Sequence, residues 1–160
     1  MIPTDHFVRY YNEVFKALHE RGREHLVAYW RELGRMQALK LAARFREGGL
    51  QACYDYWQVV HEEENCEGDM TLTEDYLAGR MDRCPSLSKA MDNDAGLFEL
   101  YCDHCMAWVE PVMEEAGLYA VMDMKSRTEP HCAFRVYKDK AKADEFERQA
   151  ILPSHPYEQE

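Results

Sequence analysis

The sequence predicts an α+β fold, in which N-terminal helices pack with a small antiparallel sheet that is crossed by a cysteine-rich helix. Apolar residues recur at helical spacing through the first half of the chain. After Gly117 the apolar period becomes two, over Leu118–Lys125 and again over Cys132–Tyr137, which predicts a β-hairpin. Helices followed by antiparallel strands are typical of an α+β domain.

Length and composition predict one domain over residues 1–160, with a helical half at about 1–66, an α+β half at about 70–140 and a mobile tail at about 152–160. The net charge of -11 argues against nucleic-acid binding and against attraction to anionic lipid. The first residues show no basic flank followed by an apolar stretch, and no apolar run approaches about 18 residues, so we expect neither a secretory leader nor a membrane span. We therefore expect a cytoplasmic protein whose six cysteines are reduced.

Three helical segments are predicted in the first half. The first ends near Gly22, the second runs from about Glu24 to Glu47, and a shorter one covers about Leu50–His61 after the Gly48-Gly49 break. Gly34 lies on the apolar stripe of the second segment and costs up to ~1 kcal/mol of helix propensity relative to Ala. That cost predicts a close contact between Gly34 and a neighbouring helix.

In the second half, short predicted strands and helices alternate with residues that end them. Weak alternation over Met70–Arg83 predicts one strand, and Pro85 ends it and opens one or two helical turns through Met91. A longer helix is predicted over Leu97–Gly117, with a kink near Ala107–Trp108 or a restart at Pro111. A short surface helix is predicted over Asp144–Ile151.

The Leu97–Gly117 helix carries the residues around which the chain is organised. At about 100° per residue, Cys102 and Cys105 lie on its apolar stripe and should be buried, while Asp103 points away. His104 lies on the flank of the stripe, where a ligand or solvent can reach it. Two thiols one turn apart are therefore expected to face the interior.

A topological argument brings more thiols to this helix. A strand that ends at Cys84 and a strand that begins at Cys132 can be neighbours in one antiparallel sheet, and the helix must lie across that sheet. Cys84, Cys102 and Cys132 should then come together with His131 at the edge. Thiolates suit Zn or Fe, so the candidate metal ligands are Cys84, Cys102, Cys105 and Cys132, with His104 or His131 as substitutes.

Two other interpretations of these cysteines stay open. Free cysteine is often an inert core residue. A thiol can also be a nucleophile whose pKa is lowered by a neighbouring base such as His131 or His104. The methionines grouped in the second half allow an accommodating apolar pocket beside the thiols.

The order Cys84-Pro85, Tyr101-Cys102 and Cys132-Ala133-Phe134 resembles the L-2-amino-thiazoline-4-carboxylic acid hydrolase-like family. The resemblance covers roughly residues 76–138. The family is often acidic at the position of Cys105, so the second helix thiol is a departure from its pattern. More distantly, the chain resembles small-molecule-binding domains of the 4-vinyl reductase type.

The resemblance implies hydrolysis of a small sulfur heterocycle, in which water adds to an amidine carbon and ring opening expels a thiolate. Such a reaction needs a group that activates water and a donor or metal that stabilises charge. The candidate catalytic residues are His131, Glu129 and His104, and the candidate substrate-binding residues are Arg127, Arg135 and Tyr101. The alternative is a non-catalytic small-molecule-binding or sensor domain with a pocket lined by Met, Tyr and Cys.

Overall fold

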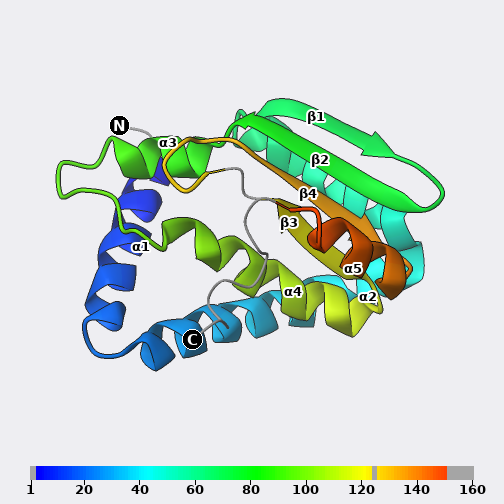
Figure 1. Ribbon diagram of the computed structural model, residues 1–160, viewed down its shortest axis with the longest axis horizontal. Helices are drawn as coiled ribbons and strands as arrows, with labels where there is room; N and C mark the ends of the chain where they lie inside the picture. Colours follow the sequence, from blue (N-terminus) through cyan, green and yellow to red (C-terminus); the bar gives the residue numbers. More distant parts are fainter. Residues whose placement is uncertain (1–2, 124–125, 151–160) are drawn as a thin grey trace.

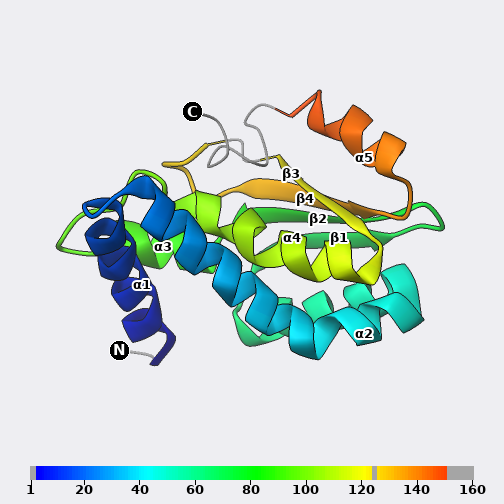
Figure 2. The same cartoon turned by 90° about the horizontal axis from the view of Figure 1, so that it is seen from below.

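The computed structural model describes residues 3–123 and 126–150 and has the α+β architecture (Figure 1). The second and fourth helices cover one face of a four-stranded antiparallel sheet, the last helix lies on the other face, and the first helix packs against the second and third helices (Figure 2). The elements are α1 (Pro3–His19), α2 (Arg23–Glu63), β1 (Glu67–Leu72), β2 (Tyr76–Arg83), α3 (Pro85–Met91), the 3-10 turn η1 (Tyr101–Asp103), α4 (His104–Ala116), β3 (Tyr119–Asp123), β4 (Cys132–Tyr137) and α5 (Lys140–Glu147).

The sheet has the strand order β1-β2-β4-β3, and every neighbouring pair is antiparallel. The predicted hairpin is confirmed as β3 and β4, while Met124 and Lys125 lie outside the described residues. The predicted adjacency of the strands before Cys84 and after Cys132 is also confirmed, because β2 pairs with β4. Phe134 and Val136 of β4 belong to the core beneath the helices, whereas Tyr137 faces α5.

Two predicted strand and helix boundaries are wrong. The single strand expected over Met70–Arg83 is a hairpin, in which β1 begins at Glu67 and Thr73 forms the turn. The Thr73 hydroxyl accepts hydrogen bonds from the amides of Asp75 and Tyr76, at 3.3 and 3.0 Å. The last helix starts at Lys140 rather than Asp144, because the Asp139 carboxylate caps it by accepting from the Ala141 amide at 2.8 Å.

The helical layer is built around α2, which packs along α4. The predicted break after Gly48 is confirmed as a kink, since Gly49 has φ 58° and ψ -145° inside α2. Residues 97–100 are not helical as predicted, and α4 continues through Pro111 without the expected restart. The hydrophobic core contains Phe15, Trp30 and Tyr101, and the ring of Phe15 contacts the rings of the other two.

No helix in residues 3–123 and 126–150 is long and apolar enough to cross a membrane.

Candidate thiol site

Four cysteines from four segments of the chain line one small cavity of about 30 Å³. They come from the end of β2, the η1 turn, the first turn of α4 and the start of β4. The residues around this cavity, which we call the thiol cavity, are Cys84, Leu87, Cys102, Cys105, Met122, Ser126, His131 and Cys132. The structure thus brings together Cys84, Cys102, Cys132 and His131, which the topological argument grouped, and adds Cys105, a candidate metal ligand.

The ends of β2 and β4 position two of these thiols. Cys132 lies opposite Met81 in the β2–β4 register, and the Cys84 amide donates to the Pro130 carbonyl. Cys84 is also the N-cap of α3, and its sulfur accepts from the Leu87 amide at 3.4 Å. Pro85 at the first helical position needs no amide partner, so the sequence Cys-Pro ends the strand and starts the helix.

The size and lining of the thiol cavity limit what it holds. A volume of 30 Å³ corresponds to about one water molecule. Small-molecule pockets occupy roughly 300–1,000 Å³. The thiol cavity as it stands therefore takes a single atom or ion and no organic ligand. Of the methionines grouped in the second half, Met122 lines it, whereas Met106 and Met113 are buried in the core.

Burial keeps these thiols protonated. It raises the pKa of Cys84 to about 11 and that of Cys105 to about 12, and it raises the pKa values of Cys102 and Cys132 further. The neighbouring sulfurs add to the shift, because each thiolate would repel the next. Cys102 and Cys105 are only half-buried, not fully buried as predicted. No cysteine here has the lowered pKa that a nucleophile needs.

His104 does not lie on an accessible flank as predicted. Its side chain is buried between the rings of Phe15 and Trp108, at centroid distances of 5.3 and 4.5 Å. Nδ1 contacts the Tyr101 carbonyl, and Nε2 lies 3.7 Å from the Cys105 sulfur. Burial lowers the pKa of His104 to about 4, so the imidazole is neutral at physiological pH. The His104 ring therefore contacts the Cys105 sulfur from the core.

Asp103 is buried, although the helical pattern predicted that it points away. The Arg127 Nε donates to Asp103 Oδ1 at 2.9 Å, and the carboxylate is fully inaccessible. Burial raises the pKa of Asp103, and Arg127 opposes that shift. Arg127, a candidate substrate-binding residue, thus anchors the segment after β3, in which Ser126 lines the thiol cavity.

The other two candidate substrate-binding residues do not line the thiol cavity. Arg135 is on the opposite face of the sheet, between the rings of Phe146 and Tyr76 at 4.3 and 5.0 Å, and it donates to the Tyr137 hydroxyl at 3.0 Å. Tyr101 is buried, and its hydroxyl hydrogen-bonds to Ser86 at 2.8 Å. Both side chains have structural partners.

His131 and Glu129 remain as accessible acid–base candidates. The His131 Nδ1 lies 3.6 Å from a Glu129 carboxylate oxygen, with side-chain exposures of 38% and 69%. Since His131 lines the thiol cavity, this pair stands at its rim. An imidazole beside a carboxylate can accept or donate a proton to a species held at the opening.

The thiols do not form a closed coordination sphere as they lie. Within the described residues, no group of three or more His, Cys, Asp or Glu side chains is arranged to hold a metal ion. The donor types suit a borderline or soft metal, but the sulfurs would have to turn toward one another to bind it.

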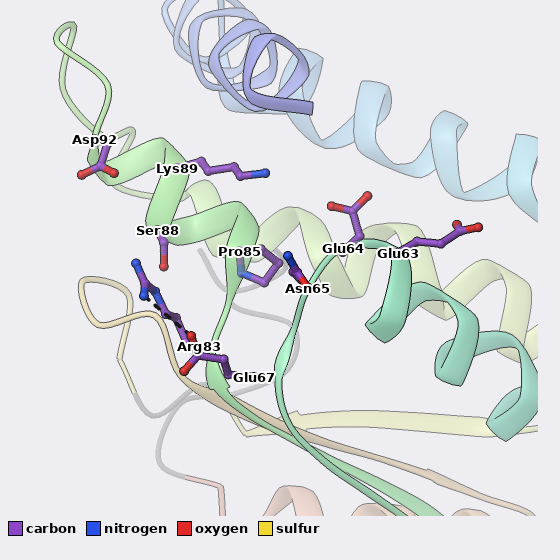
Figure 3. A pocket seen from close by; sticks show the side chains of 9 residues that line it. All are labelled: Glu63, Glu64, Asn65, Glu67, Arg83, Pro85, Ser88, Lys89 and Asp92. Atoms are coloured by element: carbon purple, nitrogen blue, oxygen red, sulfur yellow. Dashed lines mark ion pairs between the residues drawn. The ribbon is translucent and has the colours of Figure 1, made fainter. Parts of the chain in front are cut away.

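Two larger polar hollows, which share no lining residue with the thiol cavity, were missed by the sequence analysis. One, of about 530 Å³, lies between the end of α2, the start of β1 and α3, with the Arg83–Glu67 ion pair at its base (Figure 3). The other, of about 620 Å³, is lined by His61 and Cys66 among others. The sequence signal for them is the acidic run Glu62–Glu64, which contributes Glu63 and Glu64 to the first hollow and Glu62 to the second.

Comparison of the chain with protein-family models, with curated proteins and with solved structures finds no match, so the function has to be argued from the site itself.

Proposed function

We propose that the protein binds one zinc or iron ion through the thiol cavity, with Cys84, Cys102, Cys105 and Cys132 as the ligands. The observation that carries this proposal is the convergence of four thiols from four separate segments on one cavity of about 30 Å³. Inert core cysteines have no reason to gather around a common space. Such a volume suits a single ion.

The raised pKa values fit thiols that give up their protons only to a bound cation. Burial disfavours each thiolate, and repulsion between neighbouring sulfurs adds to this at Cys84, Cys102 and Cys132, so the thiols hold their protons. A bound cation reverses this balance, because it stabilises the thiolates and the protons leave. The same burial argues against the nucleophilic interpretation, since a thiol with a pKa of about 11 is almost wholly protonated at neutral pH.

The experiment is metal titration of the reduced protein. We expect one Zn²⁺ or Cd²⁺ per chain, thiolate-to-cadmium absorption, and release of protons into weakly buffered solution. Alkylation after unfolding should find the four cavity cysteines protected and Cys53 unprotected. Cys53 is a suitable internal control because it is fully buried in α2 and does not line the cavity.

Cys84→Ser separates ligation from folding. The serine hydroxyl can replace the sulfur as acceptor for the Leu87 amide, and serine is a favoured N-cap, so the variant should stay folded. Removing one ligand should weaken metal affinity by at least about tenfold. A wild-type protein that binds no metal, or a Cys84→Ser variant of unchanged affinity, would refute the proposed site.

Hydrolysis of a thiazoline-type heterocycle is the second candidate function, favoured by the His131–Glu129 pair at the rim of the thiol cavity. A bound metal would supply Lewis acidity, while His131 would take a proton from the attacking water and Glu129 would orient the imidazole. The reacting ring would sit outside the small cavity, against this rim. We place the activity in the cytoplasm, where the thiols stay reduced.

This second candidate has its own assay. The metal-loaded protein is incubated with 2-amino-thiazoline-4-carboxylate, and the thiol released on ring opening is measured. His131→Ala should abolish turnover without changing the metal content. Turnover that persists in His131→Ala would exclude the proposed base, and no turnover in the loaded wild type would leave the protein as a metal-binding domain.

A further inference from the structure

β1 is an outer strand of the sheet (Figure 1), and alternate residues along it turn their backbone groups outward. The Thr73 amide donates to the Tyr76 carbonyl at 2.9 Å, so this pair is hydrogen-bonded, and the pairs that follow alternate between bonded and non-bonded. Counted back along the β1–β2 register, Met70 and Leu72 fall in non-bonded pairs. Their amides and carbonyls therefore point away from β2, toward the free edge.

No backbone hydrogen bond within the described residues covers this edge. No loop, turn or cap in residues 3–123 and 126–150 bonds to the backbone of Met70 or Leu72. Proline and lysine, which commonly protect edge strands, are absent from Glu67–Leu72. A bulge between Glu67 and Gly68 is confined to the start of the strand. The rest of β1 is therefore a template on which one more strand can pair.

A groove runs along this free edge. The hollow of about 620 Å³, which we call the β1 groove, is lined on one side by residues 67–70 and on the other by Tyr54, Gln58 and His61 of α2. These three residues are about one turn apart and present one face of the helix. No residue of β2 lines the β1 groove, so it lies on the side of β1 that faces away from the sheet.

The walls of the β1 groove favour a basic occupant. Glu62, Glu67 and Asp69 line it, and no lysine or arginine of the described residues does. The His61 Nε2 is buried without a hydrogen-bond partner in the described part of the chain, which leaves a polar atom unsatisfied on the helix side. A second copy of the chain fits poorly, because pairing β1 with β1 would bring Glu67 and Asp69 of two chains together, each of net charge -11.

We propose that the β1 groove binds an extended, basic segment of a partner protein, which joins the sheet as a further strand beside β1. The backbone of that segment bonds to Met70 and Leu72, which is the mode of binding known as strand addition. Its side chains alternate, so that one set enters the groove toward Tyr54 and the basic set lies beside exposed Asp69. The β1 groove shares no lining residue with the thiol cavity, so this proposal does not depend on the metal site.

The probe is a capped, fluorescently labelled heptapeptide, KVKTKVK, whose lysines alternate with β-branched residues. Fluorescence anisotropy should show binding that weakens as salt is added, and the acidic counterpart EVETEVE should not bind. Hydrogen exchange followed by NMR locates the new strand. The Met70 and Leu72 amides should exchange more slowly with KVKTKVK bound, whereas the Asp69 and Thr71 amides, which the register pairs with β2, should change little.

N-methylated peptides separate strand pairing from charge attraction. Methylation removes an amide donor, and alternate amides of a strand face opposite edges. Methylating one alternate set of amides in KVKTKVK should weaken binding by about tenfold or more, because several hydrogen bonds are lost. Methylating the other set, which faces away from β1, should have little effect.

Glu62→Gln combined with Asp69→Asn tests the acidic walls. Both side chains are exposed, so the variant should stay folded, and thermal melting checks this. It should bind KVKTKVK several-fold more weakly, with a flatter salt dependence. Glu32→Gln, at an exposed glutamate in the first half of α2, removes a charge away from the groove and should bind like the wild type.

Three results would overturn the proposal. Equal effects of the two methylated peptides, or unchanged exchange at Met70 and Leu72, would exclude strand addition at β1. Failure of KVKTKVK to bind, or equal binding of EVETEVE, would exclude a basic occupant. A dimer in sedimentation, with Met70 and Leu72 already protected in the free protein, would mean that a second copy of the chain occupies the edge.

Discussion

Gly34 of α2 lies directly against Ala107 and Pro111 of α4. A Cβ atom on Gly34 would be 2.7 Å from the Ala107 carbonyl oxygen and 2.8 Å from the Pro111 Cγ. Pro111 has no amide hydrogen, so the Ala107 carbonyl four residues before it has no intrahelical donor. Proline thus frees the carbonyl, and glycine lets the backbone of α2 approach it. The close helix contact predicted for Gly34 is confirmed.

Gly34→Ala should destabilise the protein, although alanine is the better helix former. The gain in propensity is up to about 1 kcal/mol, whereas overpacking against a backbone oxygen costs about 1–3 kcal/mol. Urea unfolding measures the difference. Leu39→Ala on the exposed face of the same helix, where the side chain is 79% exposed, is the control and should change stability by less than about 0.5 kcal/mol. A Gly34→Ala variant more stable than the parent would mean that the two helices can separate at no cost.

The features that could be predicted from the sequence are those set by local pattern. Gly34 on an apolar stripe, Pro85 after a strand and the period of two after Gly117 each point to one local conformation. The convergence of Cys84 and Cys132 followed from one topological assumption, that the strand before Cys84 and the strand after Cys132 are neighbours in an antiparallel sheet, and β2 does pair with β4.

The features that could not be predicted depend on distant partners or on weak patterns. Asp103 is buried because Arg127, 24 residues away, pairs with it. His104 is buried because Phe15 of α1 covers it. β1 was missed because its residues are mostly exposed, so that Glu67–Leu72 shows no apolar alternation.

Arg127→Met should destabilise the protein by about 1–3 kcal/mol, because it removes the hydrogen-bond donor of the inaccessible Asp103 carboxylate. The second oxygen of Asp103 has no hydrogen-bond partner among the described residues, and the charge of Arg23 is the smaller remaining cationic support. Urea unfolding of the single and double variants forms a double-mutant cycle. Asp103→Asn combined with Arg127→Met should recover part of the loss, since no charge is then buried. Equal destabilisation by the single and double variants would show that the ion pair contributes nothing specific.

The pH dependence of stability should report on His104. Its pKa is about 4 in the folded protein and 6.5 ordinarily, so the unfolded chain binds more protons between these values. Stability is therefore present above pH 6.5 and is lost as the pH falls toward 4, by up to about 3 kcal/mol. His104→Phe keeps a ring in the aromatic cluster and should flatten this slope.

Two comparisons make the pH experiment specific. Burial raises the pKa of Asp103, so the contribution of Asp103 to stability changes with pH in the opposite direction. That contribution is present in both the wild type and His104→Phe. His25→Asn, at an exposed histidine near the start of α2, should keep the wild-type slope. If His104→Phe also has the wild-type slope of stability against pH, the imidazole is solvated in solution and the burial of His104 is wrong.

Thiol reactivity should follow the raised pKa values. Alkylation by iodoacetamide requires the thiolate, so at neutral pH the cavity cysteines of the native protein should react far more slowly than the same residues in the unfolded chain. The rate at Cys84 should rise about tenfold per pH unit until the pH approaches about 11, because the thiolate fraction rises in that proportion. Mass spectrometry of peptides after timed labelling assigns each rate.

Cys53 is the reference for this measurement, because it is fully buried in α2 and can react only when the helix layer opens. Its rate should track global stability, so that mild denaturant accelerates labelling at Cys53 more than at half-buried Cys84. A cavity cysteine that alkylates at neutral pH as fast as a free thiol would have an unshifted pKa. That result would return a nucleophilic role to that one residue and remove it from the proposed set of metal ligands.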